Sequence, residues 1–146
     1  MHHGPYIHAC TLALQSAGIP ASIAAVEQDP LYGELYATLD LDPDWISSTF
    51  GGLSGEEPDA VYALLWTECI GWNLGVADPA EPHPSRIRPR LPLTRQGAPE
   101  AAPTPDDLAS EAHRWLTRPR SVLSGKLLLF GQPGDRQLAK TLATYT

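Results

Sequence analysis

The stretch ALLWTECIGWNLG, residues 63–75, decides the fold because two alternating runs meet there at a short connection that contains Gly71. Alternate residues from Ala60 to Trp66 point to opposite faces of an extended chain, and the alternation resumes from Trp72 to Val76. Two such runs joined by a short glycine-containing segment predict a β-hairpin. Both faces of its first strand are apolar, which is typical of a strand at the centre of a sheet.

Trp66 and Trp72 flank the predicted turn, so the hairpin places the two indoles across from one another. Cross-strand aromatic pairs stabilise hairpins by roughly 0.2–1 kcal/mol relative to alanine pairs. The same indoles could instead form a stacking floor for a base or a cofactor ring. We interpret Trp66, Gly71 and Trp72 as a structural hairpin.

The segments around the hairpin predict further helices and strands. Pro5 opens a helix with a buried stripe that ends at Gly18, and Asp42 caps a short helix that Gly51 and Gly52 stop. The remaining predictions are strands at 21–28 and 34–42, a helix capped by Thr104 that ends before Pro119, a strand at 126–130, and a helix at 135–145 capped by Asp135.

This order of elements predicts an α+β domain, an antiparallel sheet of about four or five strands with an N-terminal helix and a late helix packed on it. A chain of 146 residues has room for one such domain with one core. We assign residues 1–120 to a single domain that includes a Pro/Arg-rich arm at 79–104, and residues 121–146 to a strand-helix tail.

Proline dominates the arm, because eight of the fifteen prolines fall within residues 78–105. This density excludes a helix and a central strand, so the segment is extended, either as a surface arm or as a linker. Arg86, Arg88 and Arg90 alternate there, so an extended backbone points them the same way.

Charge is distributed unevenly along the chain. Residues 1–85 contain twelve acids and no lysine or arginine, whereas the rest contains ten basic residues and five acids, so −12 and +5 add to the net −7. The arginines could therefore neutralise the acidic part, in this chain or in another subunit, or bind phosphates. The low pI of about 5.0 favours neutralisation, because nucleic-acid-binding domains are usually basic.

The composition and the N-terminal sequence also indicate the cellular compartment of the protein. No apolar run reaches the roughly 18 residues of a membrane span, and the start MHHGPYIHAC lacks the features of a secretory signal. Two cysteines are typical of reduced cytosolic thiols, although Cys10 and Cys69 could still pair. We expect a cytoplasmic protein without a membrane partner.

Three features in this order, the helix PYIHACTLALQSAGI, the hairpin ALLWTECIGWNLG and the segment PTPDDLASEAHRWL, resemble a family of small actinobacterial domains of unknown function. Its members show a strand ending in Trp-Asp/Thr-Glu, a Gly-Trp on the return strand and a Pro-x-Pro helix start. The resemblance spans roughly residues 4–117 and implies a bacterial protein, but no activity, cofactor or catalytic residue. The arm and the tail depart from it. The layout is also similar to type III secretion chaperones, at the level of fold alone.

Glu68 and Cys69 in the predicted turn raise the question of a reactive thiol. A catalytic cysteine needs a base, usually histidine, and a lowered pKa. The neighbouring glutamate raises the thiol pKa instead, and His8 or His113 could approach only through tertiary contact. We interpret Cys69 as a partly packed turn residue and expect no enzyme, with an unrecognised site at His8, His113 or Glu68 as the alternative. Phosphate-loop and serine-elbow motifs are missing from the sequence.

Two groups of residues suggest a metal site. One group is His2, His3 and His8 near the N-terminus, and the other is Asp40, Asp42 and Asp44. The histidines lack an H-x-x-x-H spacing, and the first two lie at an end that we expect to be mobile. The aspartates lack the glycine and glutamate of a calcium loop, and capping explains Asp42 without an ion. We expect neither a metal nor a cofactor.

Binding is the function that these exclusions leave. We expect a non-enzymatic binding module that mediates protein–protein interaction or self-association as a homodimer, through its Pro-rich arm and its tail. The alternative is a nucleic-acid-associated accessory protein that contacts phosphates through the arginines of the arm. The candidate partner-binding residues are Arg86, Arg88, Arg90, Leu127, Leu129 and Phe130.

Overall fold

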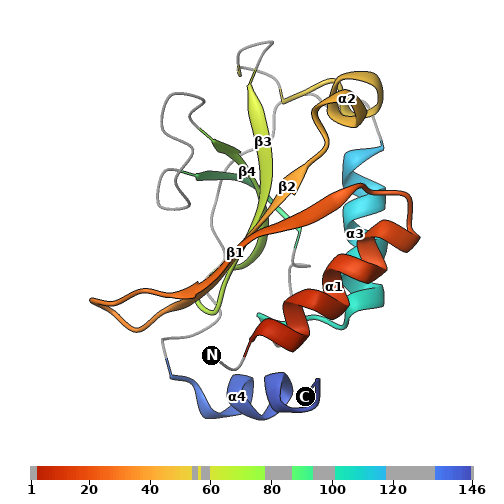
Figure 1. Cartoon of the computed structure of the whole chain (residues 1–146). Coiled ribbons are helices and arrows are strands. Elements are labelled where there is room, and N and C mark those ends of the chain that lie inside the picture. Colours follow the sequence, from red (N-terminus) through yellow and green to blue (C-terminus); the bar gives the residue numbers. More distant parts are fainter. Residues whose placement is uncertain are drawn as a thin grey trace.

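The computed structural model describes residues 3–53, 56, 60–77, 87–93, 101–117 and 134–145. Within these ranges the elements are α1 (Gly4–Ser16), β1 (Ala21–Gln28), β2 (Leu35–Leu41), α2 (Pro43–Trp45), the π-helical turn η1 (Ile46–Phe50), β3 (Val61–Thr67), β4 (Gly71–Ala77), β5 (Arg88–Pro92), α3 (Pro105–Leu116) and α4 (Arg136–Ala143) (Figure 1). The α+β fold class predicted from the sequence is confirmed.

The strands form an antiparallel sheet in which each strand pairs with the next one along the chain, in the order β1-β2-β3-β4-β5. The predicted tryptophan hairpin is β3–β4, where Trp66 directly faces Trp72 and Thr67 faces Gly71. Strand β3 is central, and all of its residues except Val61 are buried. The central position that the apolar residues on both faces of this strand predicted is therefore confirmed.

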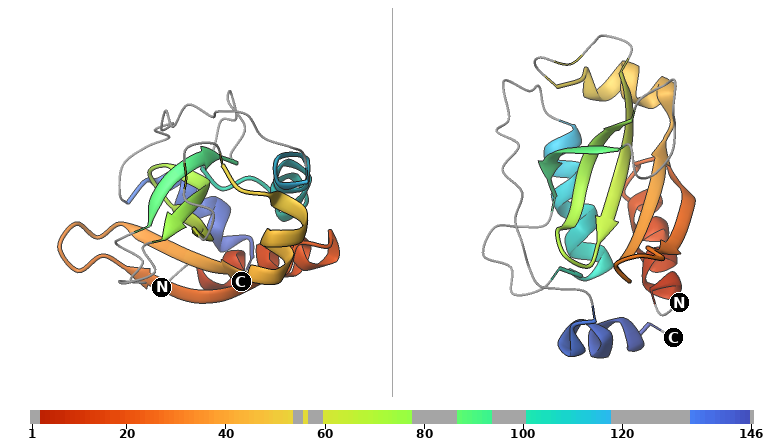
Figure 2. Two further views of the ribbon diagram at one scale, coloured as in Figure 1. Left: turned by 90° about the horizontal axis from the view of Figure 1, so that it is seen from above. Right: turned by 90° about the vertical axis from the view of Figure 1, so that its left-hand side faces the viewer.

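Helices α1 and α3 pack side by side on one face of the sheet, and α4 lies across the end nearest the start of α1 (Figures 1 and 2). Apolar side chains from these helices and the sheet form one core. Leu138 and Leu142 of α4 belong to this core. The last helix of the predicted tail thus packs against the same core as α1, α3 and the sheet.

The predicted helix signals are confirmed at the caps. A side-chain oxygen accepts a backbone N–H of the first turn at three helices, from the caps Asp42, Thr104 and Asp135. Gly51 ends η1 with a φ of 77°, a left-handed conformation that favours glycine. None of the helices in the described ranges has the length and apolar character needed to span a membrane.

Strand β5 falls inside the segment predicted to be an extended arm, and it pairs with β4 at the edge of the sheet. An edge position suits Pro89 and Pro92, because a proline has no backbone N–H to donate to a second neighbour. Gly75 of β4 permits the close approach. A Cβ atom at Gly75 would clash with the Ile87 side chain and lie 3.3 Å from the carbonyl oxygen of Arg88.

Candidate functional site

An aromatic cluster lies at the end of the sheet where β3 turns into β4, and its members are His3, Tyr6, Trp66, Trp72 and Tyr145. The Trp66 indole N–H donates to the carbonyl of Ala101 at 3.2 Å. The Trp72 indole N–H donates to the Tyr6 hydroxyl at 3.2 Å, and that hydroxyl donates to the Pro103 carbonyl at 2.7 Å. Both indoles are fully buried. They therefore pack the core, as predicted, and offer no stacking floor to a ligand.

His3 lies inside this cluster, so the prediction of a mobile N-terminal end is wrong for this residue. Its ring stacks on Trp66 with the centroids 5.7 Å apart and the planes inclined by 27°. Its Nε2 lies 3.0 Å from the carbonyl oxygen of Tyr36, which can only accept, so Nε2 carries the proton. Nδ1 is buried without a hydrogen-bond partner among the described residues. Burial lowers the pKa of His3 below the usual 6.5.

Glu68 is buried in the turn between β3 and β4, and its carboxylate connects three segments. One oxygen accepts the backbone N–H of Leu35 at 2.8 Å, at the start of β2. The other accepts the backbone N–H of Gly134 at 3.3 Å, just before α4. Two hydrogen bonds to backbone donors offset the cost of burying a carboxylate. This arrangement gives Glu68 a structural role.

Cys69, next in the turn, is not activated as a nucleophile. Burial, together with the nearby carboxylate of Glu34, raises the pKa of its thiol to about 12. Burial also raises the pKa of the Cys10 thiol to about 12. His8 and His113 are exposed, and no hydrogen bond joins either to Cys69 in the part of the chain that the structure describes. Thiols with such pKa values carry almost no thiolate at neutral pH.

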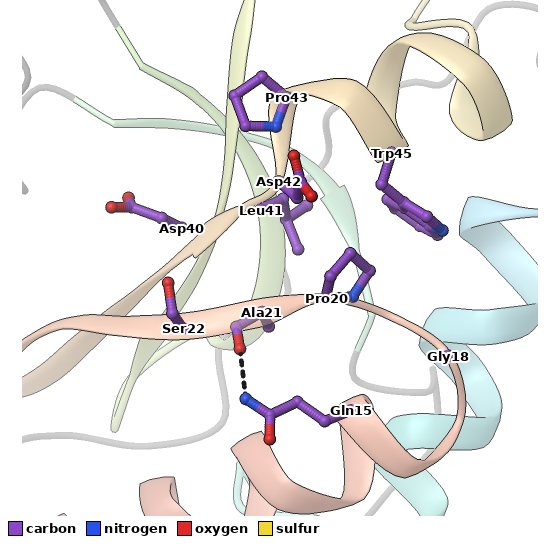
Figure 3. Close-up of a pocket in the computed structure, with 10 residues that line it drawn as sticks. All are labelled: Gln15, Gly18, Pro20, Ala21, Ser22, Asp40, Leu41, Asp42, Pro43 and Trp45. Carbon is purple, nitrogen blue, oxygen red and sulfur yellow. Dashed lines mark hydrogen bonds between the residues drawn. The ribbon is translucent and has the colours of Figure 1, made fainter.

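Metal-binding groups do not converge in the described ranges, where no three histidine, cysteine, aspartate or glutamate side chains meet. Asp42 caps α2 by accepting the backbone N–H of Asp44 at 3.0 Å. Figure 3 shows the carboxylate of Asp40 directed away from that of Asp42. His2 lies outside the described residues.

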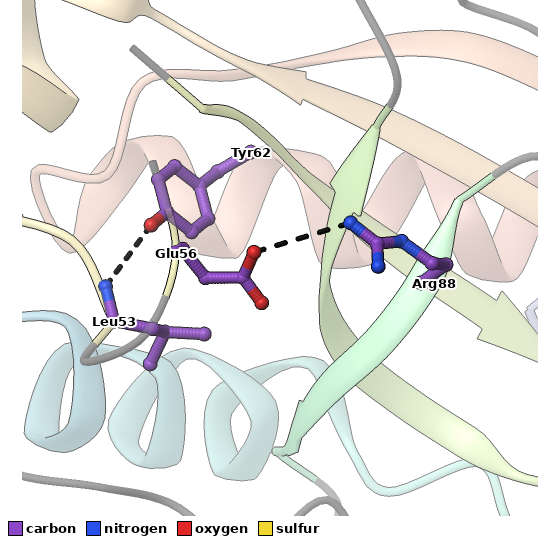
Figure 4. Close-up of polar contacts among 4 residues, drawn as sticks. All are labelled: Leu53, Glu56, Tyr62 and Arg88. Carbon is purple, nitrogen blue, oxygen red and sulfur yellow. Dashed lines mark hydrogen bonds and ion pairs between the residues drawn. The ribbon is translucent and has the colours of Figure 1, made fainter. Parts of the chain in front are cut away.

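Arg88 is the member of the predicted arginine set whose side chain the structure describes. Its guanidinium lies 3.9 Å from the Glu56 carboxylate, and the side chains are 63% and 13% exposed (Figure 4). The pair joins a basic residue of the arm to an acid within residues 1–85, which is one of the arrangements that the charge pattern left open. The other candidates, Arg86, the side chain of Arg90, Leu127, Leu129 and Phe130, lie outside the described part of the chain.

Among the described residues, cavities open beside the sheet, and two of them border candidate residues. The larger, about 660 Å³, lies where β1 begins and β2 ends, and its lining includes Ser22, Asp40, Asp42 and Trp45 (Figure 3). We call it the acidic cavity. The smaller, about 480 Å³, lies between η1 and β3, with Glu56 and Tyr62 in its lining. There the Tyr62 hydroxyl accepts the backbone N–H of Leu53 at 3.0 Å (Figure 4).

The loop between β1 and β2, residues 29–34, projects beyond the rest of the sheet (Figure 1). The Asp29 carboxylate accepts the backbone N–H groups of Leu31 and Tyr32 at 2.7 and 2.9 Å. Gly33 donates its N–H to the Asp29 carbonyl at 2.9 Å, with a φ of 73°. Leu31 is 84% exposed and Tyr32 is 77% exposed. We call these two side chains the hairpin tip.

Sequence reasoning missed the hairpin tip, His3 and the role of Glu68. The tip had a signal, because Leu31 and Tyr32 stand between the turn residues Asp29-Pro30 and Gly33. No local sequence pattern indicated the buried position of His3 or the hydrogen bonds of Glu68. Their partners, Trp66 and Tyr36 for His3 and Leu35 and Gly134 for Glu68, are remote in the chain.

Comparisons of the chain with protein-family models, curated proteins and solved structures gave no match. The resemblance to small actinobacterial domains and the similarity to secretion chaperones therefore stay predictions.

Proposed function

We propose that this chain is a non-enzymatic binding module that acts through protein–protein contact, with the hairpin tip as a contact surface. The observation that carries the proposal is the exposure of Leu31 and Tyr32, two neighbouring apolar side chains on a projecting loop. Adjacent exposed apolar groups are favourable in a complex because association removes them from water.

The loop that presents the tip is held in place before any partner arrives. A β-hairpin can reverse direction with two residues, whereas this loop uses residues 29–34. The Asp29 carboxylate accepts the backbone N–H groups of Leu31 and Tyr32, and the Gln28 side-chain amide donates to the Gly33 carbonyl, so these hydrogen bonds restrain the loop. Preorganisation lowers the entropy lost on binding, and tyrosine is enriched at interfaces.

The cytoplasm is the compartment in which we place this module, because both cysteines are free thiols. Binding to nucleic acid has less support, since the Arg88 guanidinium already lies near the Glu56 carboxylate. A partner protein or a second copy of the chain remains the better occupant of an apolar tip.

The test is purification of the tagged full-length protein from its native host across a salt gradient, without nuclease. The wild type is compared with the double variant Leu31→Ser/Tyr32→Ser and with Leu12→Ser, a half-exposed control on α1. Co-eluting proteins, light scattering and the 260/280 nm absorbance ratio are recorded for each.

We expect a stoichiometric protein partner, or a dimer, with the wild type and with Leu12→Ser, and its loss with the double variant. Unchanged circular dichroism would show that the double variant is folded. Retention of the partner by a folded double variant would overturn the proposal. So would a salt-sensitive nucleic-acid signal without any protein partner.

A further inference from the structure

We infer that β1 is a docking edge for an extended, basic segment of a partner protein, which adds a strand to the sheet and places a lysine or arginine beside Asp40. This inference rests on the proposed function and names the chemistry of the partner. It concerns a different surface from the hairpin tip, along the outer side of β1 and the acidic cavity at its start.

The two edges of the sheet differ in their ability to accept a strand. Strand β1 pairs with β2 alone, so its other side presents backbone N–H and C=O groups that no strand in the described sheet uses. Such groups are a template for an added strand. Strand β5, at the opposite edge, contains Pro89 and Pro92, which have no N–H to donate. Strand addition therefore favours β1.

The side chains of β1 leave room for another backbone. The strand has the sequence ASIAAVEQ, in which small residues predominate and neither proline nor lysine blocks the edge. One bulge, at Ala24, interrupts its pairing with β2. Beyond the bulge, residues 25–28 pair in unbroken register with residues 38–35 of β2. This regular section can support a continuous ladder with a partner strand.

The acidic residues on and beside β1 favour a basic partner segment. Asp40 faces Ser22 across the β1–β2 pair, and Glu27, the charged residue of β1, lies opposite Tyr36. No ion pair reaches Asp40 or Glu27 from the described residues, and residues 1–85 contain no lysine or arginine. A second copy docked through the same edge would supply no basic side chain, because β1 contains one glutamate and no lysine or arginine. A basic strand is attracted instead.

The acidic cavity gives that basic strand a place for one long side chain. It opens at Pro20, Ala21 and Ser22, where the Ala21 carbonyl accepts the Gln15 side-chain amide at 2.8 Å, so a strand paired with the later residues of β1 ends beside it. Figure 3 shows the carboxylates of Asp40 and Asp42 on its border and the Trp45 indole on its far side. An ammonium or guanidinium group pairs with carboxylates, and a guanidinium can also stack on an indole.

The experiment measures binding of a fluorescein-labelled synthetic peptide of alternating valine and arginine by fluorescence polarisation. Two peptides serve as controls, one with alternate backbone amides methylated and one with glutamate in place of arginine. The protein variants are Ile23→Lys, which puts a repelling charge on the edge, and Asp40→Asn. The matched control is Asp106→Asn, which removes one exposed acid at the start of α3.

Asp106 is a suitable control because the start of α3 lies by the start of α1, where Tyr6 contacts Pro103. The acidic cavity borders the other end of α1, about 20 Å away for a helix of this length. We expect Ile23→Lys to weaken binding at least about tenfold and Asp40→Asn about two- to fivefold. Asp106→Asn should bind like the wild type, and neither control peptide should bind. Amide protons of β1 should exchange more slowly in the complex.

Equal binding of the methylated peptide, an equal effect of Asp106→Asn, or no binding of the valine–arginine peptide would overturn the inference. A homodimer that Ile23→Lys dissociates would also overturn it, because the occupant would then be a second copy. None of these outcomes contradicts the proposed function, because the proposed function is tested separately, by purification of the native partner with the hairpin-tip variants.

Discussion

Strand β2 connects the aromatic cluster with the hairpin tip, because His3 of the cluster contacts the backbone of Tyr36 and the loop that carries the tip leads into this strand. The side chains of the two regions nevertheless differ in their burial. Trp66 and Trp72 are fully buried, whereas Tyr32 stands largely in water.

Hydrogen bonding explains what each region does. In the cluster, the polar atoms of Tyr6, Trp66 and Trp72 find protein partners, which permits these large side chains to leave water. At the tip the hydrogen bonds go to the backbone of Leu31 and Tyr32, which leaves their side chains free for contact. The hydrogen bonds of the cluster therefore stabilise the fold, whereas those of the tip hold a loop that exposes two apolar side chains. Four substitutions test this difference, from the largest expected effect to the smallest.

Trp66→Ala should have the largest effect, lowering the free energy of unfolding by about 3–5 kcal/mol. The substitution empties the centre of the aromatic cluster and leaves the Ala101 carbonyl without its indole donor. Urea denaturation followed by circular dichroism measures the change. A loss below about 1 kcal/mol, the size expected of an exposed residue, would contradict the assignment of this region to stability.

Tyr6→Phe should lower the free energy of unfolding by about 1–3 kcal/mol while keeping the ring. The hydroxyl that it removes accepts from the Trp72 indole and donates to the Pro103 carbonyl, so two buried groups lose a partner. The same urea titration applies. A variant as stable as the wild type would show that ring packing alone holds the cluster together.

His3→Gln should flatten the dependence of stability on pH. Burial lowers the folded-state pKa of His3 below 6.5, so between the two pKa values the unfolded chain binds more protons than the folded one. The stabilising contribution is therefore complete above about pH 6.5 and is lost as the pH falls below it. Urea midpoints measured from about pH 8 to about pH 5 should fall more for the wild type than for the variant. Parallel curves would contradict a buried, neutral His3.

Tyr32→Ser should have the smallest effect on stability, within about 0.5 kcal/mol, because the side chain is exposed and the loop hydrogen bonds use its backbone. Partner binding should nevertheless weaken in the purification described above. A destabilisation as large as that of Tyr6→Phe would show that the tip belongs to the core, and the contrast between the two regions would fail.

Much of the fold was predictable because its signals are local. The Asp42, Thr104 and Asp135 caps act on backbone donors two or three residues away, and the alternation around Gly71 sets the pairing of Trp66 with Trp72. Strand β5 was not predictable in the same way. Its proline-rich sequence forms a strand because β4 offers a ladder at the sheet edge and Gly75 lets the chain approach closely.

Local sequence patterns predicted most of the elements, the tryptophan hairpin and the division of charge between the two parts of the chain, because caps, alternation and composition are properties of neighbouring residues. Contacts between distant segments bury His3 against Trp66, let Glu68 connect the starts of β2 and α4, and leave β1 at an edge with the acidic cavity beside it. These arrangements depend on contacts between residues far apart in the chain, and no local pattern encodes which remote backbone group a buried carboxylate or imidazole will meet.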